Sequence, residues 1–225
     1  QPDPRSEAPL VFDGTRLYLQ RYWQYEVGLG FKLKQRLSLI KWPEKLVKKE
    51  LSQLFQLQPK MQLNASEIDW QAVAVCIAAT HQFSVISGGP GTGKTTTVIR
   101  LLALLVSLYQ QTEKRIPIIN LAAPTGKAAM RLSESIKGAK KSLNVTEHIK
   151  EVIPEEASTL HRLLQQRRDG TFHFNEANLL HVDVLIIDEA SMVDLPMMYR
   201  VVSALPESAQ LILLGDKDQL ASVEA

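Results

Sequence analysis

Eight consecutive residues carry the strongest chemical signal in the chain. The run Gly88-Gly89-Pro90-Gly91-Thr92-Gly93-Lys94-Thr95 matches the pattern G-x-x-x-x-G-K-[ST] without a mismatch. Glycines allow backbone N–H groups to turn inward around an anion, and the start of a following helix adds a favourable dipole. We expect Lys94 to reach the β- and γ-phosphates of ATP, the Thr95 hydroxyl to ligate Mg²⁺, and Thr96 to lie in the same site. A glycine-rich turn before a helix is the plain alternative.

Two adjacent carboxylates supply a second part of such a site. Asp188 and Glu189 follow the apolar run 184–187, which predicts a strand. We expect this strand to neighbour the one before the phosphate-binding loop, with both acids at the carboxyl edge of the sheet. Asp188 would hold Mg²⁺, directly or through water, and Glu189 would orient or deprotonate the attacking water. Either acid could instead cap the next helix.

Apolar strands alternate with helices in the part of the chain that carries these residues. Strands are expected at 83–86, 116–123, 182–187 and 211–214, and helices at 95–109 and 195–205. This alternation predicts an α/β fold of the P-loop NTPase type, with a mostly parallel sheet and helices on both faces. Ser66, with Asp69 three residues later, predicts a helix from Ser66 to Thr80. The charged stretch 137–156 is expected to be a surface excursion.

Bulk composition gives few constraints on the function. A net charge of +2 and a charged fraction of 22% are ordinary for a soluble protein, so any nucleic-acid site would have to be a local patch. The single cysteine, Cys76, cannot form an internal disulfide, which fits a reducing compartment. The N-terminus lacks a signal-peptide pattern, and no apolar run approaches the roughly 20 residues of a membrane span. We therefore expect a cytoplasmic protein with no membrane partner.

Five segments in a fixed order resemble superfamily 1 DNA helicases, and most closely the RecD family, the alpha chain of bacterial exodeoxyribonuclease V. They are SGGPGTGKTTT (87–97), AAPTGKAAMRL (122–132), STLHRLL (158–164), LIIDEASMV (185–193) and LLGDKDQL (213–220). The resemblance implies ATP hydrolysis coupled to 5′-to-3′ movement on single-stranded DNA. It also implies work in double-strand-break end processing and recombinational repair, beside RecB- and RecC-like subunits. A nucleotide-sensing regulatory module that controls a protein partner is the competing hypothesis.

The resemblance also implies a division of the chain and further site residues. Residues 1–65 would be a small helical accessory segment, and 66–225 a RecA-like first motor lobe whose second lobe is absent from this chain. Asp216 and Gln219 would lie near the γ-phosphate, and Gln71 would recognise the adenine edge through its side-chain amide. The DNA-contacting residues would be Pro124, Thr125, Gly126, Lys127, Thr159 and His161.

Each of these residues has a plainer alternative. Gln219 could lie in an ordinary loop and Gln71 on a helix surface. Residues 124–127 could be a turn that caps a helix, and His161 could be packed or solvated. The basic stretch between Lys32 and Lys49 is typical of a solvated helix face, with a phosphate- or partner-contacting surface as the alternative.

Overall fold

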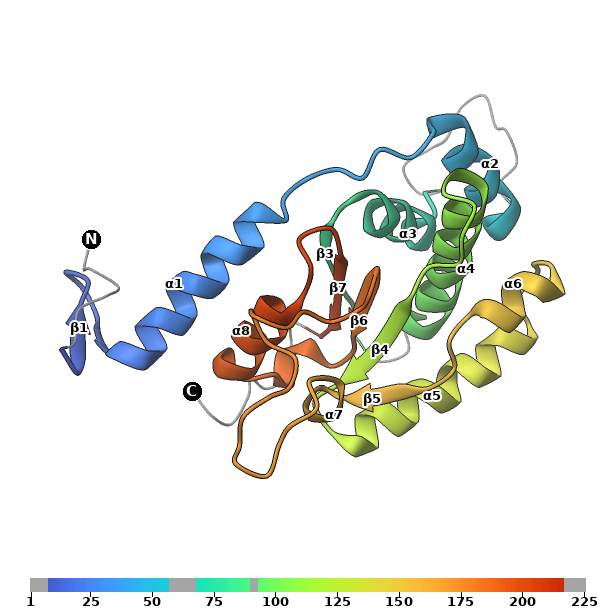
Figure 1. The fold of residues 1–225 in the computed structure, drawn as a ribbon. Coiled ribbons are helices and arrows are strands. Elements are labelled where there is room, and N and C mark those ends of the chain that lie inside the picture. The colour runs from blue at the N-terminus through green and yellow to red at the C-terminus, as the bar shows by residue number, and fades with distance from the viewer. Residues whose placement is uncertain (1–7, 57–67, 90–92, 217–225) are drawn as a thin grey trace.

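The computed structural model describes residues 8–56, 68–89 and 93–216, and the statements below concern those residues. In chain order the elements are β1 (Leu10–Phe12), β2 (Leu17–Leu19), α1 (Gln20–Gln35), α2 (Glu44–Phe55), α3 (Trp70–Thr80), β3 (Phe83–Ser87), α4 (Lys94–Thr112), β4 (Ile119–Ala123), α5 (Gly126–Lys141), α6 (Glu147–Val152), β5 (Ala157–Thr159), α7 (Leu160–Leu163), β6 (Val184–Ile187), the 3₁₀ helix η2 (Ala190–Met192), α8 (Leu195–Ala204) and β7 (Gln210–Gly215) (Figure 1).

Five of the described strands form the central sheet in the order β3-β7-β6-β4-β5, and every neighbouring pair is parallel. This confirms the expected α/β architecture. One expectation was wrong, because β6, which ends at the carboxylate pair, is not beside β3. β7 lies between them, and its Leu213 pairs with Val85 on one side and with Ile187 on the other. The three strands still end at one edge, since all run in the same direction.

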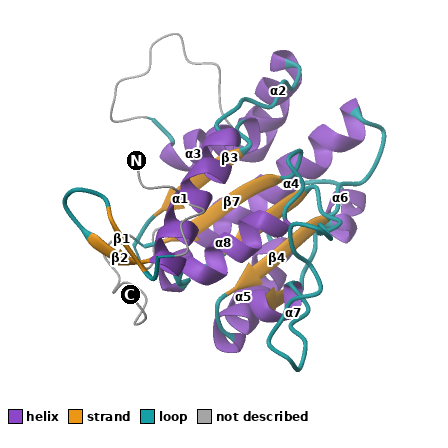
Figure 2. Ribbon diagram, turned by 60° about the vertical axis from the view of Figure 1, so that its left-hand side comes forward, coloured by secondary structure: helices purple, strands orange, loops and turns teal. Residues whose placement is uncertain are grey.

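Helices cover both faces of this sheet (Figure 2). On β6, Ile186 packs into the hydrophobic cluster that contains α4, whereas Leu185 and Ile187 pack into the cluster that contains α8. Side chains that alternate along a strand therefore reach two separate cores. Residues of α2, α3, α4, α5 and α6 belong to the first cluster, and residues of α1, α7 and α8 belong to the second. Every residue of α4 from Leu101 to Tyr109 is buried, so α4 is the central helix of the first face.

The N-terminal helices are divided between the two faces. α1 packs on α8, where a Cβ added to Gly28 would lie 2.6 Å from the ring of Tyr199. Arg36, just after α1, is 5% exposed and donates hydrogen bonds to main-chain carbonyls that include those of Leu205 and Ala209. α2 packs on α4 across the other face. α1 and α2 lie in the part of the chain expected to be a small helical segment, but the β1–β2 hairpin was not predicted.

Two local expectations were also wrong. α3 begins at Trp70 rather than at Ser66, because Asp69 is its N-cap and accepts hydrogen bonds from the next turn. The stretch 137–156 is not a surface excursion. It holds the end of α5 and all of α6, and its Leu143 and Ile153 are buried in the cluster around α4. Widely spaced apolar residues in a charged stretch are a weak periodic signal, which explains the second error.

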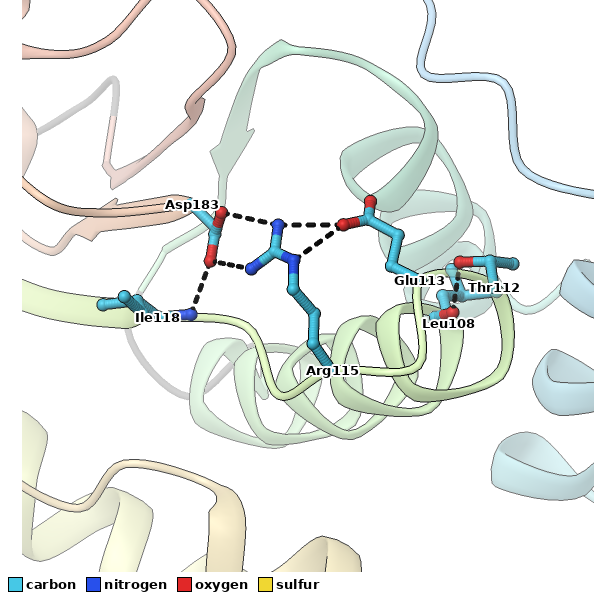
Figure 3. Close-up of polar contacts among 6 residues, drawn as sticks. All are labelled: Leu108, Thr112, Glu113, Arg115, Ile118 and Asp183. Carbon is cyan, nitrogen blue, oxygen red and sulfur yellow. Dashed lines mark hydrogen bonds and ion pairs between the residues drawn. The ribbon is translucent and has the colours of Figure 1, made fainter.

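An ion-paired aspartate joins the start of β6 to the segment before β4. Arg115 Nη1 and Nη2 donate to the two Asp183 carboxylate oxygens over 2.6 and 2.8 Å, and the Ile118 N–H donates to Oδ2 over 2.7 Å (Figure 3). Arg115 also contacts Glu113 at 2.8 Å. Burial raises the pKa of the Asp183 carboxyl, but the hydrogen bonds from Arg115 and Ile118 outweigh it and hold the pKa below its ordinary value.

Replacing this aspartate is expected to destabilise the fold in a pH-dependent way. Asp183→Asn should lower the free energy of unfolding by about 1–2 kcal/mol near neutral pH, because the bonds are charge-assisted but solvent screens the pair. Arg115 is 44% exposed. A carboxyl with a lowered pKa stabilises the fold above its unfolded pKa of about 3.9 and loses that effect as pH falls through the folded value. Urea unfolding at neutral pH and below about pH 3 should therefore show the difference and then its disappearance. A difference that persists in acid would indicate disturbed packing.

Candidate nucleotide site

Four loops meet at the carboxyl edge of the sheet. They begin with Gly88 after β3, Pro124 after β4, Asp188 after β6 and Asp216 after β7. Main-chain hydrogen bonds join them in pairs: Gly88 N–H donates to the Gly215 carbonyl at 3.2 Å, and Asp188 N–H donates to the Ala122 carbonyl at 2.9 Å. In parallel α/β sheets this edge is where ligands bind.

The phosphate-binding loop connects β3 to α4, as its motif predicts. Gly93 caps α4 with a φ of 81°, in the left-handed region that favours glycine, and an added Cβ would lie 2.4 Å from Gln71 Nε2. α4 begins directly at Lys94, so its first N–H groups face the loop and favour an anion. Lys94 and Thr95 are half-buried and Thr96 is exposed. Pro90, Gly91 and Thr92 lie outside the described residues.

Gln71 lies beside this loop, although it is 17 positions earlier in the chain. A cavity of about 220 Å³ is lined by Trp70 and Gln71 of α3, by Ser87 and Gly88 after β3, and by Lys94. The close approach of Gln71 Nε2 to Gly93 places its amide at the wall between this cavity and the loop. The side chain predicted to recognise a base and the lysine predicted to bind phosphates therefore share one cavity.

The Asp188 carboxyl is affected by the positive charge of Lys94, the lysine expected to bind phosphates. Burial raises the pKa of its carboxyl, and the charge of Glu189 raises it further. The Glu189 N–H, which donates to Asp188 Oδ1 over 2.9 Å, and the positive charge of Lys94 both lower it in part. The net pKa lies above its ordinary value, because the effect of burial is the largest of these.

Glu189 occupies an unusual backbone conformation for a residue with a side chain. Its φ of 51° lies in the left-handed region, which typically costs about 1–3 kcal/mol and is concentrated at functional sites. Its Oε2 atom is buried and has no hydrogen-bond partner among the described residues. A buried oxygen without a partner is costly, so a polar group that enters the site would be bound favourably there. This arrangement suits an acid that receives a water molecule.

A hard cation would find suitable oxygen atoms at this edge. The Thr95 hydroxyl and the Asp188 carboxylate are the ligand types that Mg²⁺ takes, and Mg²⁺ is usually held by one or two such groups together with substrate phosphates. No group of three or more His, Cys, Asp or Glu side chains with metal-binding geometry occurs in the described part of the chain. A cation here would thus depend on oxygens supplied by a nucleotide.

The residues predicted to contact DNA lie on two neighbouring loops. β4 pairs with β5, with Ala123 opposite Thr159, so the segments that follow these strands lie side by side. Thr125 accepts a hydrogen bond from the Ala128 N–H at the start of α5, and Thr159 accepts one from the Arg162 N–H at the start of α7. The capping turn held open for 124–127 is therefore present. Each cap uses the hydroxyl as an acceptor and leaves its proton available to a phosphate oxygen.

The remaining predicted residues have different outcomes. Lys127, Gly126 and His161 are exposed on this surface, and Pro124 is half-buried. Asp216 is 5% exposed at the end of β7. Gln219 lies outside the described residues, so its role stays a prediction. The sequence argument missed Ser191, whose buried hydroxyl lacks a partner among the described residues, and Arg100, which contacts Gln71. Arg100 is the only charged residue between Lys94 and Glu113, which is a signal that could have identified it.

Comparisons with known proteins agree with this geometry. The family model described as an AAA domain matches residues 71–225. The chain is 43% identical to the RecBCD enzyme subunit RecD of Haemophilus influenzae over 99% of its own length and 35% of that protein. It is 41% identical to RecD of Mycolicibacterium smegmatis over 94% of its length and 36% of that protein. The chain thus spans about a third of the length of the RecD subunits that it matches.

More distant proteins share part of the chain or the fold. The ATP-dependent RecD2 DNA helicase of Deinococcus radiodurans is 37% identical over 69% of this chain and 18% of that protein. The UvsW helicase of bacteriophage T4 has a TM-score of 0.51 over 80% of this chain and 62% of that one, at 13% identity, which shows a shared fold. None of the described helices is long and apolar enough to cross a membrane. The fold is that of a P-loop NTPase, and the chain belongs to the AAA domain family and to the RecD family.

Proposed function

We propose that this chain is the nucleotide-binding lobe of an ATP-dependent helicase or translocase that acts on single-stranded DNA. The observation that carries the proposal is the convergence of the phosphate-binding loop with Asp188 and Glu189 at one sheet edge, next to the exposed start of α5, which holds Lys127. ATP hydrolysis at that edge could be coupled directly to a change in the neighbouring loop. Relatives named RecD subunit and RecD2 DNA helicase support the assignment.

The roles of the site residues follow from their positions. Lys94 and the N-terminal N–H groups of α4 bind the phosphates of ATP, together with Gly88 to Gly93. Thr95 and Asp188 would hold Mg²⁺, which would neutralise phosphate charge. Glu189 accepts the proton of the attacking water through its buried carboxylate. Asp216 and Gln219 report the presence of the γ-phosphate to the rest of the lobe.

The wider setting is part of the same proposal. Residues 1–65 form an accessory segment, and 66–225 form the first of two motor lobes. The resemblance to RecD supports 5′-to-3′ movement, RecB- and RecC-like partner subunits, and a role in double-strand-break end processing and recombinational repair in the cytoplasm. These properties concern the whole protein, of which the chain matches about a third in its relatives.

The test is ATP hydrolysis by the intact protein with and without single-stranded DNA, beside Lys127→Ala. We expect strong stimulation by DNA, and an affinity for DNA in the variant that is lower at every sequence, because a lysine–phosphate contact carries no sequence information. The slope of log affinity against log salt should fall by about 0.7 when one phosphate contact is lost. Lys137→Ala, an exposed lysine on α5 away from the sheet edge, is the matched control. Hydrolysis that is indifferent to DNA would contradict the motor and favour a regulatory module that answers to a protein partner.

A further inference from the structure

One arginine connects the N-terminal helices to the nucleotide cavity. Arg100 lies on α4, where the surrounding residues 97–99 and 101–109 are buried. Its Nη1 donates a hydrogen bond to Gln71 Oε1 at 3.3 Å. Its guanidinium also lies over the ring of Phe55, the last residue of α2, at 4.4 Å from the ring centroid. Residues of α2, α3 and α4 thus meet at the side-chain amide of Gln71.

We propose that Arg100 is a positioning residue that fixes the orientation of the Gln71 amide, and thereby sets the preference for adenine over guanine nucleotides. Phe55 holds the guanidinium in place for this purpose. The inference rests on the proposed function, because it takes the cavity beside Lys94 as the nucleotide site. It adds a specificity residue from α4 and a supporting residue from the N-terminal segment.

The argument starts from the two faces of a glutamine amide. The oxygen and the nitrogen of the amide are nearly equal in shape, so packing alone does not choose between the two orientations. An arginine has only donors and therefore favours the orientation that presents the oxygen to it. In the structure Oε1 faces Arg100 and Nε2 faces Gly93 of the phosphate-binding loop. Arg100 thus selects one of two otherwise similar orientations.

The selected orientation matters because the edge formed by N7 and the substituent on C6 differs between the two purines at the substituent. Adenine presents a donor at N6 beside the acceptor N7, whereas guanine presents acceptors at both O6 and N7. An amide held in one orientation can donate from Nε2 to N7 and accept from N6, since Oε1 has a second lone pair beside the one used by Arg100. Guanine would place O6 against Oε1. Turning the amide would only move the repulsion to N7 of guanine, whereas adenine is matched at both atoms in the orientation that Arg100 favours. Holding that orientation therefore favours adenine.

Phe55 explains why arginine rather than lysine occupies this position. The planar guanidinium can lie flat on an aromatic ring and still donate in its own plane, which an ammonium group cannot do as well. The contact joins α2 to α4, which pack against each other. The position of α2 therefore affects Arg100, and through Arg100 the amide of Gln71. The N-terminal segment therefore contributes to nucleotide choice without touching the nucleotide.

The experiment compares ATP and GTP binding by the intact protein, measured by competition against a fluorescent ATP analogue. The variants are Arg100→Met, Arg100→Lys, Phe55→Ala and Gln71→Ala. Arg100→Met should reduce the ratio of ATP to GTP affinity by about 5- to 10-fold, the net effect of one typical hydrogen bond, mainly through weaker ATP binding. Arg100→Lys should recover part of the preference, and Phe55→Ala should lose part of it.

Arg115→Met is the matched control. Arg115 also lies over an aromatic ring, that of Tyr109 at 4.9 Å, but beyond the far end of α4. This variant should lower the melting temperature and keep the wild-type nucleotide preference. Thermal unfolding of every variant shows whether it is folded, and Arg100→Lys tests the inference if Arg100→Met fails to fold.

Two results would overturn the inference and leave the proposed function standing. Equal weakening of ATP and GTP binding in Arg100→Met would mean that Arg100 only supports the cavity. An unchanged ATP preference in Gln71→Ala would mean that this amide does not recognise the base. Failure of the proposed function is a different result, namely hydrolysis by the wild-type protein that does not respond to single-stranded DNA.

Discussion

Lys94→Gln is expected to abolish measurable ATP hydrolysis in the intact protein while leaving the fold unchanged. Lys94 is the first residue of α4 and lines the cavity that Gln71 also lines, so we expect its ammonium group to reach the phosphates of ATP. Loss of one preorganised charge from such a site costs about 10²–10³ in kcat. The side chain is half-buried, and Gln keeps most of its aliphatic length, so the fold should tolerate the replacement.

The measurement is steady-state ATPase activity with saturating single-stranded DNA, together with far-ultraviolet circular dichroism and thermal unfolding. For Lys94→Gln we expect no ATP hydrolysis above background and an unchanged melting temperature. Lys137→Gln is the control, because Lys137 is exposed on α5 and has no expected role in phosphate binding. Normal turnover in Lys94→Gln would exclude the phosphate-binding loop as the catalytic site, and a lowered melting temperature would show a structural role instead.

The strands of the central sheet could be predicted because a parallel sheet covered by helices on both faces has a recognisable sequence pattern. Each such strand is nearly all apolar, and the four strands predicted overlap β3, β4, β6 and β7. The motif residues sit where these strands end, so their meeting at one edge followed from strand direction alone. Strand direction does not determine the order of the strands in the sheet. Nothing in 211–214 indicates that β7 separates β3 from β6, because order depends on contacts between segments far apart in the chain.

The contacts that shape the candidate site were less accessible to prediction for the same reason. The motif indicates that Gly93 and Lys94 bind phosphate, but the contact of Arg100 with Phe55 joins residues 45 positions apart. Periodicity identifies buried elements, whereas the side chains that orient a functional group are isolated polar residues without a periodic pattern.

The left-handed backbone of Glu189 is the basis of a second prediction, which concerns turnover and can be separated from the effect of Lys94. Its φ of 51° turns the chain sharply after β6, and the side chain reaches a buried position where Oε2 has no partner among the described residues. Folding places a carboxylate there at a cost in free energy. The cost is explained if the carboxylate binds and activates water during hydrolysis, and it has no explanation if the residue only begins η2.

Glu189→Gln is therefore expected to lower kcat by about 10²–10⁴, the usual contribution of a general base, while ATP binding persists. The substitution keeps the shape of the side chain and removes the proton-accepting charge. It also removes a negative charge near the phosphates, so the affinity for ATP should stay equal or rise, in contrast to Lys94→Gln, in which both binding and turnover fall. Equilibrium binding of a fluorescent ATP analogue, measured beside single-turnover hydrolysis, separates the two variants. Turnover close to that of the wild type would assign the proton transfer to another group. A parallel loss of binding would instead show that Glu189 supports the geometry of the site rather than the chemical step.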